Sequence, residues 1–207
     1  ENRHLLPIQR SFHLTSIAHI RLQQGDIDTA LATYRSAVDL SRRARHADGL
    51  VQSLRMLGHA LLGLARYDEA LPYLKEAAQL FAQLEDRVSE AEMWTGVARI
   101  LERQSPEDAA RAWEPVLTIH RHRGDARSEL EAREGLARAL RAQGVVEAIA
   151  AFESALALAA TLGERGRQAA IRNVLGIMEW ERGSFVQALT HYESALALIR
   201  GHGSRGD

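Results

Sequence analysis

The chain repeats a short pattern of residues at intervals of 39 or 40 positions, and this repeat limits the folds that the chain can adopt. In each repeat a small residue is followed four positions later by a large apolar or aromatic side chain. The small residues are Ala30, Ala70, Ala109, Ala148 and Ala188, and the large ones are Tyr34, Leu74, Trp113, Phe152 and Tyr192. Because one such unit cannot bury its apolar face alone, the repeat predicts a stack of similar units.

Another small residue lies upstream in every repeat and is preceded by an apolar one. These pairs are Ile17-Ala18, Leu57-Gly58, Val97-Ala98, Leu136-Ala137 and Leu175-Gly176. We interpret them as points where a first helix approaches a second helix closely. The two small residues of a repeat lie 12 positions apart in repeats one, two and five, but 11 apart in repeats three and four. This difference predicts a shorter turn between the helices of the two middle repeats.

Every element of the chain is expected to be a helix. Apolar residues recur at helical spacing, as at Leu130, Leu136 and Leu140, and no stretch alternates as a strand does. Two helices per repeat give ten helices. Helix starts are predicted at capping boxes that begin at Ser89, Ser105, Ser128 and Ser184. Helix ends are predicted at Gly124, Gly163 and Gly203, since glycine adopts the left-handed conformation at low cost.

The pattern Leu54-x-x-Leu57-Gly58-x-x-Leu61, followed by Tyr67-Asp68-Glu69-Ala70, Leu74 and Ala77, resembles the tetratricopeptide repeat (TPR) family. The resemblance covers about residues 11–200 and implies an all-α fold, a right-handed α-solenoid superhelix of about five helix-turn-helix repeats. The expected repeats span about residues 11–47, 48–87, 88–126, 127–165 and 166–203. Each unit is longer than the usual repeat of about 34 residues and lacks its closing proline. It is similar to the long-repeat subgroup found in kinesin light chains, animal polarity scaffolds and many bacterial regulators.

Composition excludes several classes of protein. The net charge of -1, from 26 Lys and Arg against 27 Asp and Glu, offers no basic surplus for a nucleic acid. The absence of cysteine excludes disulfides and thiolate metal sites. The longest apolar run, residues 155–162, is too short to cross a bilayer. We therefore expect no direct nucleic-acid partner, no membrane partner and a cytoplasmic location.

No linker-like stretch interrupts the repeats, so we expect a single domain over residues 1–207. Lys75 is the only lysine among many arginines, which is typical of a GC-rich bacterial genome. The last helix keeps Leu196, Leu198 and Ile199, although solenoid ends normally carry a polar cap. We interpret the chain as a part of a longer protein, with self-association through uncapped ends as the alternative.

No motif indicates catalysis, a cofactor or a metal site. Gly201, Gly203 and Gly206 match the letters of a dinucleotide-binding loop, but they follow a helix instead of a strand. The Arg-Gly-Asp triplets at 123–125 and 205–207 fall where the repeat requires a turn. His120 and His122 point about 200° apart on a helix, so they cannot hold one ion together. The prediction is a protein that is not an enzyme and that binds no cofactor.

The TPR resemblance implies that certain first-helix positions line a concave groove. The residues selected as a binding site are His19, Leu22, Arg55, His59, Leu62, Arg99, Arg138, Arg141, Asn173, Ile177 and Trp180. The four arginines are suited to bind carboxylates of an acidic or extended segment. Alternatively, they pair with the interleaved Glu92, Glu102, Glu131 and Glu134. Trp180 is assigned either to the groove or to the core, and Trp94 and Trp113 are assigned to the core.

Three functions are compatible with these features. The leading one is a non-catalytic module that binds a protein or peptide in its groove, as part of a larger regulatory or assembly protein. The second is a ligand- or peptide-sensing domain of a bacterial transcription regulator or signalling ATPase. The third is a scaffold that forms homo-oligomers.

Overall fold

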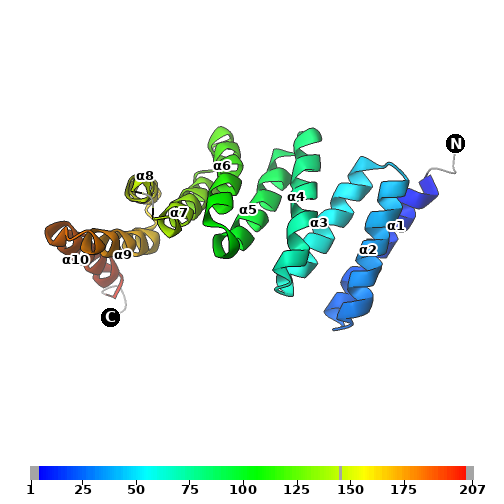
Figure 1. The fold of residues 1–207 in the computed structure, drawn as a ribbon, viewed down its shortest axis with the longest axis horizontal. Helices are drawn as coiled ribbons and strands as arrows, with labels where there is room; N and C mark the ends of the chain where they lie inside the picture. The colour runs from blue at the N-terminus through cyan, green and yellow to red at the C-terminus, as the bar shows by residue number, and fades with distance from the viewer. Residues whose placement is uncertain (1–4, 145, 204–207) are drawn as a thin grey trace. The chain divides into compact units, whose positions relative to one another are not determined.

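The computed structural model describes residues 5–144 and 146–203, and within these ranges every regular element is an α-helix (Figure 1). The helices are α1 (Leu5–Gln23), α2 (Ile27–Arg43), α3 (Ala47–Gly63), α4 (Tyr67–Gln83), α5 (Arg87–Gln104), α6 (Pro106–Arg123), α7 (Ala126–Ala142), α8 (Glu147–Thr161), α9 (Arg165–Glu181) and α10 (Phe185–Gly203). They fall into the five expected pairs. The predicted all-α helical-repeat solenoid is confirmed.

The chain divides inside α5 into two units, Glu1–Ile100 and Leu101–Asp207. In the first unit, α2 packs against α1 and α3, and α3 also packs against α4. In the second unit, α7 packs against α6 and α8, and α9 packs against α8 and α10. Helices joined by such short connections run antiparallel, so each unit is a row of helical hairpins.

The small residues that define the repeat lie at close approaches between helices. All ten of them, two in each repeat, are buried. A Cβ added to Gly58 would lie 2.6 Å from Leu74 Cδ2, and one added to Gly176 would lie 2.8 Å from Tyr192 Cε1. Both distances are shorter than van der Waals contact, so a larger residue would push the helices apart. The register predicted from the sequence is confirmed.

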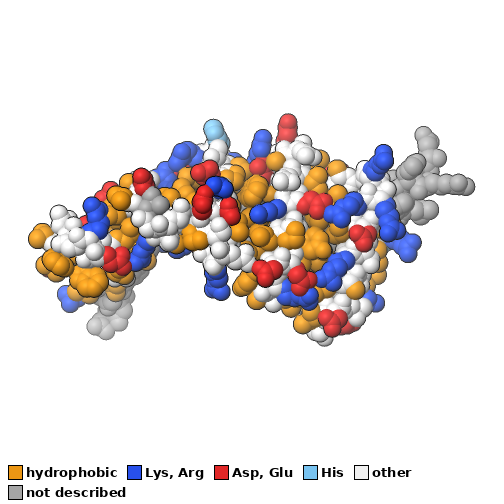
Figure 2. All heavy atoms as spheres, viewed as in Figure 1, with side chains coloured by type: hydrophobic (Ala, Val, Ile, Leu, Met, Phe, Trp, Pro, Cys, Tyr) orange, Lys and Arg blue, Asp and Glu red, His pale blue; other side chains and the backbone are white. Residues whose placement is uncertain are grey.

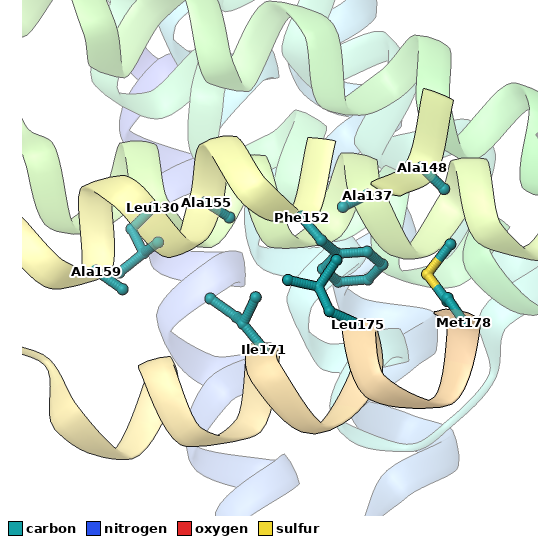
Figure 3. Close-up of a cluster of buried hydrophobic side chains, with 9 residues drawn as sticks. All are labelled: Leu130, Ala137, Ala148, Phe152, Ala155, Ala159, Ile171, Leu175 and Met178. Atoms are coloured by element: carbon teal, nitrogen blue, oxygen red, sulfur yellow. The ribbon is translucent and has the colours of Figure 1, made fainter. Parts of the chain in front are cut away.

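The large residues of the second helices fill the core. Tyr34, Leu74, Trp113 and Phe152 are at most 3% exposed, whereas Tyr192 on α10 is 36% exposed. In the second unit Phe152 of α8 packs with Leu130 and Ala137 of α7 and with Ile171, Leu175 and Met178 of α9 (Figure 3). The core assignment is confirmed for Trp113, while Trp94 is only half-buried.

A residue with positive φ follows most of the helices. Glycine takes this place at Gly25, Gly124, Gly144, Gly163 and Gly183, which confirms the predicted ends at Gly124 and Gly163. Arg45, Ala65 and Glu85 adopt the same conformation with φ between 52° and 59°. The backbone N–H of each of these three residues donates a hydrogen bond to the carbonyl three residues earlier. A carbonyl of the last helical turn is therefore satisfied without a glycine at this position. The described part of α10 extends to Gly203, so the helix end predicted there stays a prediction.

Two of the predicted capping serines are wrong. Ser105 does cap α6, and its side chain accepts a hydrogen bond from Asp108 N–H. At α5 and α7, however, the caps are Asp86 and Asp125, which accept hydrogen bonds from the N–H groups of Ser89 and Ser128. The pKa of Asp86 is lowered mainly by the N–H of Ser89 and then by its hydroxyl, and the pKa of Asp125 mainly by the hydroxyl of Ser128 and then by its N–H. Each aspartate directly precedes its helix and lies three residues before the serine. It is therefore in the N-cap position, from which a side chain accepts hydrogen bonds from the unpaired N–H groups of the first helical turn. Ser184 directly precedes α10, as predicted.

The prediction of shorter turns holds for one of the two middle repeats. In repeat three only Ser105 separates α5 from α6, whereas three residues separate α1 from α2. In repeat four α7 ends at Ala142 and α8 begins at Glu147, so the connection is not shorter. The shorter spacing between Ala137 and Ala148 instead shortens α8. This helix begins one residue before Ala148, whereas α2 begins three residues before the equivalent Ala30, and with 15 residues it is the shortest of the ten described helices.

Candidate functional site

In the first unit, two of the predicted groove residues share one acidic partner. Arg55 and His59 lie one turn apart on α3, and both contact the carboxylate of Glu92 on α5. Arg55 Nη1 is 3.6 Å from Glu92 Oε2, and His59 Nε2 is 3.2 Å from Glu92 Oε1. The Arg55 side chain is 32% exposed and the His59 side chain 40% exposed, so both are partly accessible from solvent.

The other predicted residues of this unit differ in exposure. His19 on α1 and Arg99 on α5 are exposed, and Leu22 on α1 is half-buried. Leu62 on α3 lies against α5, because a Cβ added to Gly96 would be 3.3 Å from Leu62 Cδ1. Of the predicted groove residues in this unit, the exposed ones, His19 and Arg99, are therefore polar.

In the second unit, the predicted arginines are also paired with glutamates. Arg138 Nη2 on α7 is 3.0 Å from Glu102 Oε1, and the same oxygen accepts a hydrogen bond from Trp113 Nε1 at 3.0 Å. Arg141 Nη2 is 3.5 Å from Glu181 Oε1. Such partly exposed pairs contribute about 0–1 kcal/mol each. A ligand carboxylate can therefore replace the internal partner at little cost.

Three predicted residues lie on α9. Asn173 is exposed and Ile177 is half-buried. Trp180 is 60% exposed, so its assignment to the core is wrong. Its indole is available for contact with a partner, as aromatic residues at binding hot spots often are.

A hollow of about 130 Å³ lies between α7 and α9 and contains residues that the sequence did not single out together. Its lining consists of Glu134, Arg138, Phe152, Arg167, Ala170, Ile171 and Val174. Phe152 and Ile171 approach each other from α8 and α9 in the core below it (Figure 3). The hollow thus combines an apolar wall with two guanidinium groups and one carboxylate.

Glu134 is the most perturbed of these groups. Its side chain is 17% exposed, and Arg167 Nε lies 3.9 Å from its Oε1 atom. Burial raises the pKa of Glu134, while the positive charges of Arg167 and Arg138 oppose this shift. Oε1 is buried and accepts no hydrogen bond. The sequence placed Glu134 only among partners for arginine, because its position over Phe152 depends on how α7, α8 and α9 pack.

The remaining sequence motifs lie at helix ends or outside the described residues. In the ranges that the structure covers, no three His, Cys, Asp or Glu residues are grouped so as to hold a metal ion. Gly124 ends α6, so the triplet at 123–125 is a turn as predicted. Gly206 and the triplet at 205–207 lie outside the described residues. Among the described helices, none is both long and apolar enough to span a bilayer.

Stacked helix pairs with a period of 39 or 40 residues and accessible first-helix faces define a class of helical-repeat proteins. The chain belongs to the tetratricopeptide repeat family. One family model with the description tetratricopeptide repeat matches residues 10–83, and a second with the same description matches residues 55–118 and 147–202. This family is generally one of non-catalytic protein–protein interaction modules.

Solved structures share the fold. BtubC (BKLC) from P. vanneervenii has a TM-score of 0.74 at 18% identity, covering 100% of this chain and 86% of the other. The kinesin light chain TPR-like repeats of Podosopora anserina have a TM-score of 0.73 at 20% identity, covering 97% and 99%. MamA from Desulfovibrio magneticus RS-1 has a TM-score of 0.68 at 18% identity, covering 94% and 98%. No curated protein matches the chain by sequence.

Proposed function

We propose that this chain is a non-catalytic module that binds an extended segment of a partner protein, and that the hollow between α7 and α9 is the main anchor point. The hollow carries this proposal. Its apolar wall of Phe152, Ile171 and Val174 suits one apolar side chain of the segment. Its volume of about 130 Å³ suits a side chain better than a whole metabolite.

The charges around the hollow favour an acidic residue beside that apolar side chain. Arg138 and Arg167 line the hollow, and their present partners are Glu102 at 3.0 Å and Glu134 at 3.9 Å. An incoming carboxylate gains two guanidinium neighbours, since arginine can bind carboxylates through two parallel hydrogen bonds. Glu134 limits the number of acidic residues that the hollow accepts, because two adjacent carboxylates repel each other.

The test is to fill the hollow without disturbing the core. Ala170 lines the hollow and is exposed, so Ala170→Trp occupies the space from its rim. Ala157 on α8 is also exposed but does not line the hollow, and Ala157→Trp is the matched control. Both variants and the unmodified chain are used as bait for a display library of random peptides and for lysate.

We expect the unmodified chain and Ala157→Trp to select the same peptides, enriched in an apolar residue next to Asp or Glu, and Ala170→Trp to lose at least tenfold in affinity by calorimetry. Arg138→Glu together with Arg167→Glu should abolish the preference for acidic residues. Equal binding by Ala170→Trp and the control would show that the partner uses another surface.

A further inference from the structure

The second helix of the last repeat carries a continuous apolar stripe in solvent. Phe185, Leu189, Tyr192, Leu196 and Ile199 follow one another at steps of four and three residues on α10, so they share one helix face. They are 64%, 57%, 36%, 45% and 61% exposed. Hydrophobic side chains are visible on the surface over α9 and α10 (Figure 2). An unpaired stripe of this size marks an interaction surface.

The other repeats show which kind of element covers this stripe. The residues equivalent to Tyr192 are Tyr34, Leu74, Trp113 and Phe152, all of which are buried. Those equivalent to Leu196 in the first two repeats, Val38 and Ala78, are buried as well. In the internal repeats the second helix packs against the first helix of the next repeat, as α2 packs against α3, α6 against α7 and α8 against α9. The stripe on α10 therefore has the shape of a repeat junction.

The matching half of such a junction is exposed on α1. Ile17 and Ile20 are 43% and 56% exposed. Their equivalents in the second repeat, Leu57 and Ala60, are 0% and 7% exposed, and those in the fifth, Leu175 and Met178, are 0% and 8% exposed. In those repeats a preceding second helix is available for packing. The apolar face of α1 is thus the type of surface that covers a second helix.

We propose that copies of this chain associate head to tail, with α1 of one copy packed against the α10 stripe of the next. The contact continues the junction already formed by α2 with α3 and by α8 with α9. Both halves belong to the same chain and follow the same residue register, so a second copy carries a face that matches each of them. Because the two halves differ, the contact is heterologous and adds copies one after another. This inference is independent of the proposed binding hollow, whose residues lie on α7, α8 and α9.

The test separates the two halves of the contact. The tail variant is Leu189→Glu with Leu196→Glu, and the head variant is Ile17→Glu with Ile20→Glu. All four side chains are at least 43% exposed, so the changes leave the core intact, and circular dichroism checks the helical content. The control is Val88→Glu, which introduces a charge at a residue on α5 that is 50% exposed and lies on neither face.

Light scattering is recorded over a hundredfold range of protein concentration. We expect the unmodified chain and Val88→Glu to exceed 23.0 kDa increasingly as concentration rises, and each double variant alone to stay monomeric. An equimolar mixture of the head and tail variants should form a dimer and nothing larger, since it retains one intact pair of faces.

Three outcomes would overturn the proposal. A monomeric unmodified chain at every concentration shows that α10 is covered by something other than a second copy. Oligomers of the head variant alone show a symmetric contact between two α10 helices. A mixture that stays monomeric shows that α1 and α10 do not recognise each other.

Discussion

Gly135 on α7 lies directly against the indole of Trp113 on α6. A Cβ added to Gly135 would be 2.2 Å from Trp113 Cε2, and the indole cannot move away because Trp113 is fully buried and donates a hydrogen bond to Glu102. The repeat sequence predicted that Trp113 belongs to the core. It did not predict the role of Gly135, because the small residue of the repeat register on α7 is Ala137, which packs with Phe152 of α8, whereas Gly135 faces Trp113 of the preceding helix.

We predict that Gly135→Ala destabilises the protein, by about 1–3 kcal/mol, because overpacking at the indole outweighs the gain of about 1 kcal/mol in helix propensity. The matched control is Gly63→Ala, at the end of α3, where an added Cβ meets nothing within 4 Å. That control should be neutral or stabilising. Urea unfolding followed by circular dichroism measures both. A Gly135→Ala variant as stable as the control would show that α6 and α7 are not packed as closely as described.

The charged residues of the site were predictable in type but not in arrangement. The resemblance placed Arg55, Arg138 and Arg141 on the groove-lining face of the first helices. The structure pairs each of them with a glutamate of a neighbouring first helix. Which glutamate each arginine meets depends on side-chain directions across two helices. Residue spacing within one helix does not contain that information.

At the scale of the helices, the existence and order of the elements were predictable, while their capped ends were less so. A run such as Asp125-x-x-Ser128-x-x-Glu131 contains two overlapping capping patterns, and only the course of the backbone after Gly124 selects the aspartate. In the same way, glycine marked the ends of α6 and α8, but Arg45, Ala65 and Glu85 hold the same left-handed conformation with nothing in the pattern to indicate it.

We expect Ala65→Gly to stabilise the connection between α3 and α4. Ala65 has φ 56°, a conformation that costs residues with a Cβ about 1–2 kcal/mol relative to glycine. Part of this gain is lost to the greater freedom of glycine in the unfolded chain, so the net increase should be about 0.5–1 kcal/mol. The reciprocal change Gly25→Ala, at φ 83°, should be destabilising by a similar amount. Thermal unfolding of both variants decides the point, and a loss of stability in Ala65→Gly would contradict it.

For the molecule as a whole, ionisation of capping aspartates connects stability to pH. The N–H and hydroxyl groups of Ser89 and Ser128 hold the pKa values of Asp86 and Asp125 below the usual 3.8. A carboxyl group whose pKa is lower in the folded state contributes stability above its unfolded pKa, and loses that contribution as the pH falls through the folded value. The helices α5 and α7 should therefore weaken in the acid range below 3.8.

The double variant Asp86→Asn with Asp125→Asn tests this prediction, since asparagine caps a helix nearly as well but does not titrate. Near pH 7 its free energy of unfolding should be close to that of the unmodified chain. Between about pH 4 and pH 2 it should lose less stability than the unmodified chain does. If the free energy of unfolding of the two proteins fell equally with pH, the two aspartates would be excluded as the source of the loss of stability in acid.

In the described ranges the helices pack against near neighbours in sequence, and this has a consequence for how the chain acquires its structure. Each of the contacts α1 with α2, α3 with α4 and α9 with α10 joins segments separated by about three residues. No long loop has to close before such a hairpin forms, and proteins with local contacts fold quickly. During synthesis a hairpin can form while later repeats are still being made, and each finished hairpin offers an apolar face on which the next one assembles.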